Sequence, residues 1–309
     1  ASLTPNYRLP GVVPAQGKNL TSRMLYSADR PLDITRLAIA LQSCGVGHTV
    51  DYHESTASTM QIAHQLANDP ATRSGTVVVA EEQSEGMGRM NRRWEAPNHS
   101  SLLMSLIIKS PQLPASPSQL PMMAGIAIVR ALLAVEPELT DEVGLKWPND
   151  VLLGEDLATG HKVAGVLIET AFRLNTMEYA IVGMGINVHQ QANELPVLPA
   201  GAPPATSLAT WLGRGLERPV DRTALMIALC TAWDKLLSRR ERHDIHREWR
   251  NLLYTLGQPV TVATGRGAPH TIITGVAIDV GVEGDLLVQD QLGHIHSVNA
   301  GDVTTRPPG

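Results

Sequence analysis

The sequence predicts an α+β protein, built as a mixed β-sheet with helices and followed by a small β-barrel near the C-terminus. From residue 48 onward, short apolar segments with strand character are joined by hairpin-like connections, and the helical segments are grouped instead of following every strand. This arrangement favours a mixed sheet over a doubly wound parallel one. After Gly257, Gln258 and Pro259 the chain changes to short β-branched runs separated by glycine-containing turns, which is typical of a small barrel.

Apolar periodicity locates the individual elements. Sheet strands are expected at 49–53, 76–81, 102–108, 143–147, 150–153, 163–169 and 179–184. Helices are expected at 33–42, 59–68, 119–135, 221–237 and 243–254. Barrel strands are expected at 260–263, 271–279, 285–289 and 294–298.

These changes of pattern divide the chain into three regions. Residues 1–47 form an N-terminal arm with one short helix, because the first thirty residues are rich in Pro, Gly and Ser and have no helical period. Residues 48–254 form the main domain and residues 255–309 the C-terminal one. A winged helix-turn-helix needs about 60 residues with three helices, so we expect no DNA-binding unit in the arm.

Composition excludes several classes of protein. The 309 residues are 43% hydrophobic and 18% charged, with a formal net charge of -5, so the chain is expected to fold around an ordinary core and lacks the basic surplus of a non-specific nucleic-acid binder. Cys44 and Cys230 lie far apart and have no metal-ligand spacing, so neither a disulfide framework nor a zinc site is indicated. The sequence has no long apolar run and no signal-peptide pattern, which predicts a cytoplasmic protein without a membrane partner.

A loop rich in glycine and arginine follows the second expected strand. Gly86 and Gly88 let the backbone come close to a ligand, and Arg89, Arg92 and Arg93 supply cations suited to phosphate or carboxylate. The loop lacks both the phosphate-loop signature GxxxxGK[ST] and the third glycine of a dinucleotide fingerprint. Taken alone, it could be an anion-binding loop or a solvated turn.

Three further segments favour the binding interpretation. Residues 146–150 (KWPND) place a cation, an aromatic ring, an amide and a carboxylate together at the end of a strand. Lys162 begins an apolar strand in which Gly165 permits close approach to the backbone. Residues 183–187 (GMGIN) end the next strand with two glycines and an amide. Each segment by itself could also be structural.

In this order and spacing, the segments resemble the biotin protein ligase family. The family pattern is Ser-Thr-Asn, a glycine and arginine loop ending in Trp, KWPND, a K-x-x-G strand followed by Glu, G-x-G-I-N and an SH3-like C-terminal domain. The resemblance covers residues 48–309. The short arm is similar to the monofunctional branch of the family, which has no DNA-binding domain.

The resemblance implies roles for individual residues. Biotin would be bound by Ser58, Thr59, Gln83, Gly86, Met87, Gly88, Arg89, Lys162 and Gly165. The first three would surround the ureido ring, because a buried ureido group needs several paired donors and acceptors. The nucleotide would be bound by Arg92, Trp94, Asn149 and Asn187, and Mg²⁺ by Asp150. Lys162, Arg89 and Asp150 would act in catalysis.

Three positions depart from the family pattern. Met87 stands where the loop usually has its first arginine, Asn91 where it usually has glycine, and Met60 where asparagine usually follows Ser-Thr. Asn91 is the non-glycine residue type best able to adopt a positive φ. A second register of the Ser-Thr motif, at Ser55 and Thr56, also stays open.

The implied activity is an ATP-dependent ligase. It would form biotinyl-adenylate from biotin and ATP, and then transfer biotin to a lysine on the biotin carboxyl carrier domain of a carboxylase. ATP and Mg²⁺ would be required, nucleic acid and membrane would not be partners, and the enzyme would be a monomer or a homodimer. Two alternatives are a lipoate ligase or octanoyl transferase of the same fold, and a biotin-binding regulator without catalysis. The ligase interpretation requires the arginine loop and Lys162 to converge on one pocket.

Overall fold

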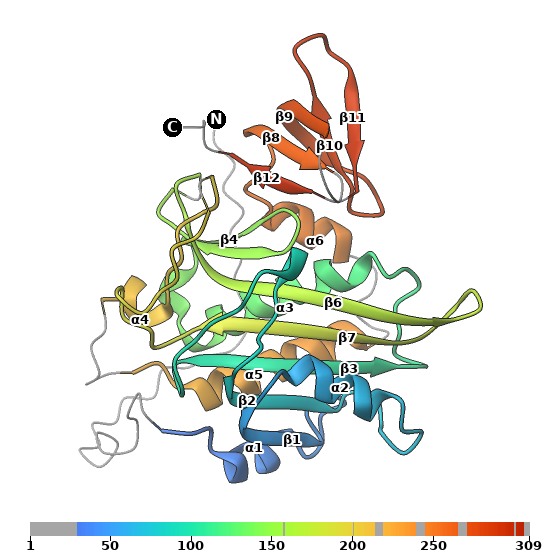
Figure 1. Cartoon of the computed structure of the whole chain (residues 1–309), viewed down its shortest axis with the longest axis vertical. Coiled ribbons are helices and arrows are strands. Elements are labelled where there is room, and N and C mark those ends of the chain that lie inside the picture. Colours follow the sequence, from blue (N-terminus) through green and yellow to red (C-terminus); the bar gives the residue numbers. More distant parts are fainter. Residues whose placement is uncertain are drawn as a thin grey trace.

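A seven-stranded mixed sheet carries the central part of the chain (Figure 1). The computed structural model describes residues 30–305 except 157, 200, 214–218, 239–244, 265–270 and 300, so most of the expected arm lies outside the described residues. The strand order is β1-β2-β3-β7-β6-β5-β4. The strands are β1 (Val50–Thr56), β2 (Val77–Gln83), β3 (Ser101–Lys109), β4 (Val143–Lys146), β5 (Asp150–Leu153), β6 (His161–Arg173) and β7 (Thr176–Asn187). Only β1 and β2 pair in parallel among these neighbours, which confirms the mixed sheet.

Helices cover both faces of this sheet (Figure 1). The helix α2 (Thr59–Ala67) connects the parallel pair β1 and β2, as a crossover between parallel strands requires, and packs on one face against Val78, Ile107 and Ile181. The helices α1 (Ile34–Leu41), α3 (Gln119–Val135), α5 (Arg222–Leu237) and α6 (Ile245–Leu252) share the larger core on the other face. Val77 and Val79 point into that larger core because side chains alternate along a strand.

A second, five-stranded antiparallel sheet follows, in the order β11-β10-β9-β8-β12. Its strands are β8 (Pro259–Thr264), β9 (Thr271–Val280), β10 (Leu286–Gln289), β11 (Ile295–Val298) and β12 (Asp302–Thr304). This sheet is the C-terminal unit expected from the sequence. The strand β12, the one-turn helix α4 (Leu208–Trp211) and the 3-10 helices η2 (Arg89–Asn91) and η3 (Pro137–Leu139) were not expected, because each is too short to show a period.

Two adjacent residues of the KWPND segment join the two sheets. Lys146 is 6% exposed, and its Nζ donates to the carbonyl oxygen of Val303 in β12. Trp147 is 2% exposed, and its Nε1 donates to the carbonyl oxygen of Gly284 at 2.8 Å. The amide of Trp147 also donates to Thr255 Oγ1 at 3.0 Å. We propose that the main domain ends at residue 254 and that these bonds seat the C-terminal domain on the end of β4.

Both cysteines are free, as the sequence predicted. Cys230 is buried on α5, and burial raises the pKa of its thiol to about 12. Cys44 is partly buried, and burial followed by the nearby charge of Asp234 raises its pKa as well. Both thiols therefore stay protonated at neutral pH.

The described helices include none with the length and apolar character needed to cross a bilayer.

Replacing Trp147 by Phe should lower the free energy of unfolding by about 0.5–1.5 kcal/mol more than the same change at Trp233. Trp147 and Trp233 are 2% and 0% exposed, so both variants lose the same buried volume. Trp147 Nε1 donates to a carbonyl, whereas Trp233 Nε1 meets the thioether sulfur of Met184, which is a weak acceptor. Urea denaturation followed by circular dichroism measures both losses, and equal losses would contradict a stabilising bond to Gly284.

Candidate active site

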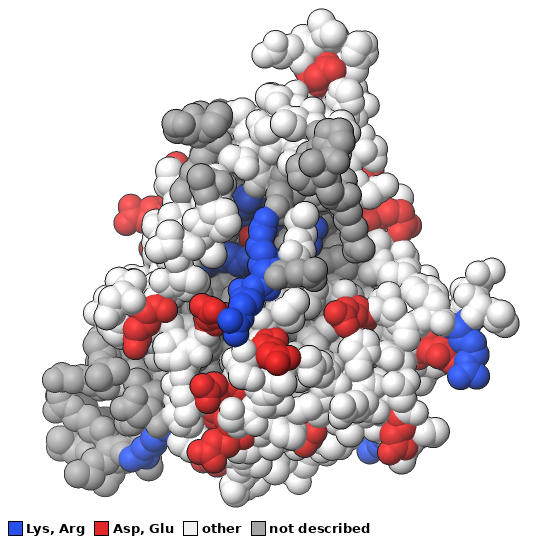
Figure 2. All heavy atoms as spheres, in the orientation of Figure 1, with Lys and Arg blue, Asp and Glu red and all other residues white. Residues whose placement is uncertain are grey.

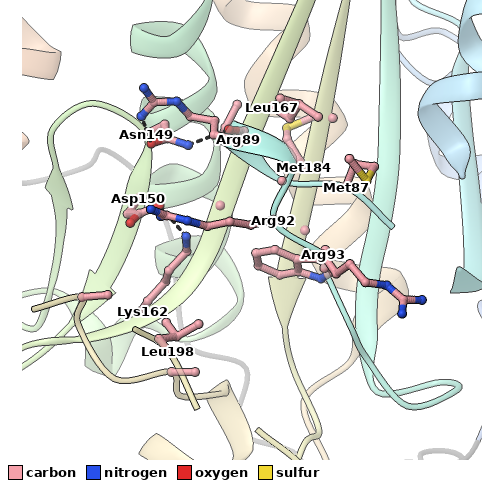
Figure 3. Close-up of a pocket in the computed structure, with 18 of the residues that line it drawn as sticks. Met87, Arg89, Arg92, Arg93, Asn149, Asp150, Lys162, Leu167, Met184 and Leu198 are labelled. Carbon is pink, nitrogen blue, oxygen red and sulfur yellow. Dashed lines mark hydrogen bonds and ion pairs between the residues drawn. The ribbon is translucent and has the colours of Figure 1, made fainter. Parts of the chain in front are cut away.

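A cavity of about 210 Å³ opens where the arginine loop, the KWPND segment and the start of β6 meet. Its wall includes Arg89 and Arg92 from the loop, Asn149 and Asp150 from the KWPND segment, and Lys162 from β6 (Figure 3). The expected convergence of the loop and Lys162 on one pocket is therefore confirmed. In the space-filling view, positive side chains gather at this part of the surface (Figure 2).

One end of the cavity is built from hydroxyl and amide groups. The backbone amide of Thr59 donates to Gln83 Oε1 at 2.8 Å, and Thr59 Oγ1 lies 3.1 Å from the same oxygen. Thr59 Oγ1 also lies 2.8 Å from Ser105 Oγ. Ser58 is the N-cap of α2 and 2% exposed, yet its side chain makes no capping bond. Ser58, Thr59 and Gln83 all line the cavity, which favours this register over the one at Ser55 and Thr56.

Two of the cationic residues that line the cavity bond to two adjacent residues of the KWPND segment. Lys162 Nζ lies 2.6 Å from Asp150 Oδ1, and both side chains are about one fifth exposed, at 22% and 19%. Arg89 Nη1 donates to Asn149 Oδ1 at 2.9 Å. Asn149 Nδ2 in turn donates to the carbonyl oxygen of Val166 in β6 at 2.7 Å. Asp150 compensates the charge of Lys162, whereas Asn149 gives Arg89 a hydrogen-bond acceptor but no negative charge (Figure 3).

Strand register places a flat floor beside these cations. Asp150 pairs with Gly165, and Gly165 pairs with Gly185 across β5, β6 and β7. The indole of Trp94 lies on the two glycines, since a Cβ at Gly185 would be 2.5 Å from Trp94 Cε2 and one at Gly165 would be 3.0 Å from Trp94 Cζ3. Lys162 Nζ lies 5.8 Å from the centroid of the Trp94 ring, within reach of a cation-π interaction. The group that approaches Gly165 most closely is therefore Trp94 itself.

The arginine loop is a small hairpin. The amide of Gly88 donates to Arg92 O at 2.7 Å, and the amide of Trp94 donates to Gly86 O at 2.8 Å. The left-handed backbone is adopted by Met90, with φ of 56°, one position before the asparagine favoured by the sequence. Gly86 is not among the described residues that line the cavity, although a Cβ there would be 2.4 Å from Trp94 O. Its small size lets the hairpin close, and the expected contact of Gly86 with biotin stays a prediction.

The remaining expected residues line the cavity in different ways. Met87 and Gly88 contribute from the loop. Asn187 also lines it and is 5% exposed, but its Nδ2 donates to Thr206 O and its Oδ1 accepts from Gln190 Nε2. Asn187 therefore positions the chain that follows β7 more directly than it offers groups to a ligand.

Parts of the wall were not assigned to residues from the sequence, among them Leu103 and Met104 of β3 and the two segments described next. The first is a proline-rich segment between β7 and α4, represented by Pro196, Leu198, Pro199, Gly201, Ala202, Pro203 and Ala205. It is tied to the start of β6, because the amide of Lys162 donates to Pro204 O at 2.7 Å. The second comprises Gly301, Val303 and Thr304 of the C-terminal sheet. Neither part has a period or a charge pattern that could have marked it.

The arrangement defines an enzyme-like pocket for an anionic ligand. The wall offers the hydroxyl and amide groups of Ser58, Thr59 and Gln83, the cation Arg89, and Lys162 beside the carboxylate of Asp150. Carboxylate and phosphate groups are the usual partners of such cations in a partly buried site.

Sequence comparison agrees with this class. The profile of the Biotin/lipoate A/B protein ligase family matches residues 52–187. The biotin (acetyl-CoA-carboxylase) ligase of Mycobacterium tuberculosis is 32% identical over 280 residues, which cover 88% of this chain and 95% of that protein. The bifunctional ligase/repressor BirA of Bacillus subtilis is 29% identical, over 88% of this chain and 78% of that protein. The chain therefore belongs to the biotin/lipoate A/B protein ligase family, on its biotin protein ligase branch.

Solved structures share the fold. The biotin protein ligase from Aquifex aeolicus in complex with biotin and ATP superposes with a TM-score of 0.63 at 24% identity, covering 84% of this chain and 98% of that chain. The biotin protein ligase from Leishmania major in complex with biotinyl-5-AMP superposes with a TM-score of 0.56 at 22% identity, covering 82% and 99%. The architecture of a mixed-sheet domain followed by a small β domain is common to all three.

Proposed function

We propose that this chain is an ATP-dependent biotin protein ligase, which makes biotinyl-adenylate and passes biotin to a lysine on the biotin carboxyl carrier domain of a carboxylase. The observation that carries the proposal is a single cavity. Its wall contains the cations Arg89 and Lys162 together with a hydroxyl and amide cluster suited to a urea ring. Membership of the family supports biotin as the substrate. The enzyme is proposed to act as a monomer or a homodimer.

In the first half-reaction the biotin carboxylate attacks the α-phosphorus of ATP and pyrophosphate leaves. The carboxylate is already ionised at neutral pH, so this step needs alignment and charge neutralisation but no general base. Lys162 and Arg89 offset the negative charge where the two anions meet. Arg92 and Trp94 line the part of the cavity assigned to the nucleotide. Ser58, Thr59 and Gln83 hold the ureido ring at the polar end.

Mg²⁺ would enter with the nucleotide. The described residues contain no cluster of three or more His, Cys, Asp or Glu side chains able to hold a metal. Mg²⁺ bound with phosphate needs only one or two carboxylates besides phosphate oxygens and water. Asp150 lines the cavity beside Lys162, so it fits this modest requirement and is the proposed ligand. The ion would supply additional positive charge at the phosphates.

In the second half-reaction the nitrogen of the acceptor lysine attacks the acyl carbon of biotinyl-adenylate, the bond from that carbon to the phosphate oxygen breaks, and AMP leaves. The lysine must first lose a proton, since its reference pKa is about 10.4. Asp150 is the carboxylate placed to take this proton. The loop and the proline-rich segment cover the cavity, and this limits hydrolysis of the mixed anhydride.

The decisive experiment is biotin-dependent release of pyrophosphate from ATP, followed by mass measurement of a carrier domain. Release with biotin and a mass gain equal to one biotinyl group are expected. Release with lipoate in place of biotin would identify a lipoate ligase, and binding of biotin without release would identify a non-catalytic regulator. Either result would overturn the proposal.

Replacing Lys162 by Ala should lower the rate of pyrophosphate release by about 100-fold or more, because one charge that offsets the developing anion is lost. Lys109→Ala is the matched control, since Lys109 Nζ donates to the carbonyl oxygens of Asp69 and Thr72, and Lys109 is not among the described residues that line the cavity. Circular dichroism establishes that both variants fold. A near wild-type rate in Lys162→Ala would remove Lys162 from the mechanism.

Replacing Gly185 by Ala should raise the KM for ATP by about 10-fold or more, because the new methyl group displaces the rigid indole of Trp94. Gly183→Ala is the matched comparison on the same strand face. A Cβ at Gly183 would be 2.7 Å from Met60 Sδ, the flexible part of a side chain that can move aside. Steady-state kinetics should therefore show a smaller rise for Gly183→Ala, and equal rises would argue against Trp94 as part of the binding floor.

A further inference from the structure

Asn149 uses both ends of its amide on the protein itself. Its Oδ1 accepts from Arg89 Nη1 at 2.9 Å, and its Nδ2 donates to Val166 O at 2.7 Å. Each end keeps one further hydrogen-bonding position, because an amide oxygen accepts two bonds and an amide nitrogen donates two. The side chain thus already links two parts of the site through protein groups alone.

The bond to Arg89 crosses from a rigid element to the loop. Asn149 immediately precedes β5, and its Nδ2 ties it to the backbone of β6. The loop is closed on itself by backbone bonds between Gly88 and Arg92 and between Gly86 and Trp94. The loop side chain of Arg93 returns to Ser84 within the same segment. The bond between Arg89 and Asn149 is thus a link from the hairpin to the sheet at the cavity.

We propose that Asn149 is a positioning residue, which holds the arginine loop closed over the reactive intermediate by accepting a hydrogen bond from Arg89. This proposal rests on the proposed function, because the intermediate is biotinyl-adenylate. Charge assistance makes the bond stronger than one between neutral groups, and loss of the acceptor removes a bond that helps to fix the direction of the guanidinium. Opening of the loop then exposes the mixed anhydride to water and to amines other than the acceptor lysine.

The test measures escape of preformed biotinyl-adenylate from the full-length protein. Asn149→Ala should release the adenylate about 10-fold faster than the unaltered chain. It should also increase biotin labelling of serum albumin relative to labelling of a carrier domain. Asn149→Asp separates the two ends of the amide, because it keeps an acceptor for Arg89 and loses the donor to Val166 O. Retention of the adenylate in Asn149→Asp is expected, and escape equal to that of Asn149→Ala would overturn the proposal.

A double-mutant cycle with Arg89→Gly tests whether Asn149 acts through Arg89. In that case Asn149→Ala adds little to the escape already caused by Arg89→Gly, because the shared bond can be lost only once. Asn187→Ala is the matched control, since Asn187 lines the same cavity but bonds to Thr206 and Gln190, and its effect should add to that of Arg89→Gly. Additive effects of Asn149→Ala and Arg89→Gly would overturn the proposal.

The outcomes also separate this proposal from the function on which it rests. Absence of biotin-dependent pyrophosphate release by the unaltered chain would reject the ligase function. Normal release by the unaltered chain together with slow escape from Asn149→Ala would leave the ligase function in place and reject the role of Asn149 alone.

Discussion

The structure depends on keeping two positive charges together at the wall of one cavity. Arg89 and Lys162 come from different segments, and their mutual repulsion in a partly buried place would drive them apart unless each had an acceptor. Asn149 and Asp150 supply these acceptors from adjacent positions, so the spacing of the cations follows from the backbone of two residues. A neutral amide for one cation and a carboxylate for the other leave a net positive charge for an anionic ligand.

The KWPND segment therefore performs two tasks with different halves. Lys146 and Trp147 bind the C-terminal sheet through carbonyl oxygens of Val303 and Gly284, while Asn149 and Asp150 hold the cations. The connection has a functional consequence, because the sheet held by Lys146 also contributes Val303 and Thr304 to the cavity wall. The stability of the contact between the two sheets and the completeness of the cavity wall thus both depend on the KWPND segment.

Long elements with a clear period were predictable from the sequence, and the bounds of α3 and β5 agree with the expectation. The β6–β7 hairpin is longer than the sequence predicted. Phe172 and Leu174 near its turn are exposed, so this part of the hairpin has no alternating apolar pattern by which the strands could be recognised. Convergence of the charged motifs was inferred from the family resemblance, since the arginine loop follows β2 and the KWPND segment follows β4, and these two strands are not neighbours in the sheet. The partner of each side chain was not predictable. That Trp94 covers Gly165, or that Gly86 serves the hairpin, depends on distances between segments that local patterns do not contain.

Because this chain departs from the family pattern at Met60 and Met87, ligand recognition depends more on the remaining polar groups of the site. Met60 packs against Gly183, and Met87 lines the cavity where the family usually has a cation. Recognition of a urea must therefore rest on the cluster of Thr59, Gln83 and neighbouring hydroxyl groups, and the charge that Met87 does not supply must come from Arg89. A mobile arginine side chain provides that charge only when its direction is fixed. In this chain, the amide of Asn149 meets that requirement from the rigid end of the sheet.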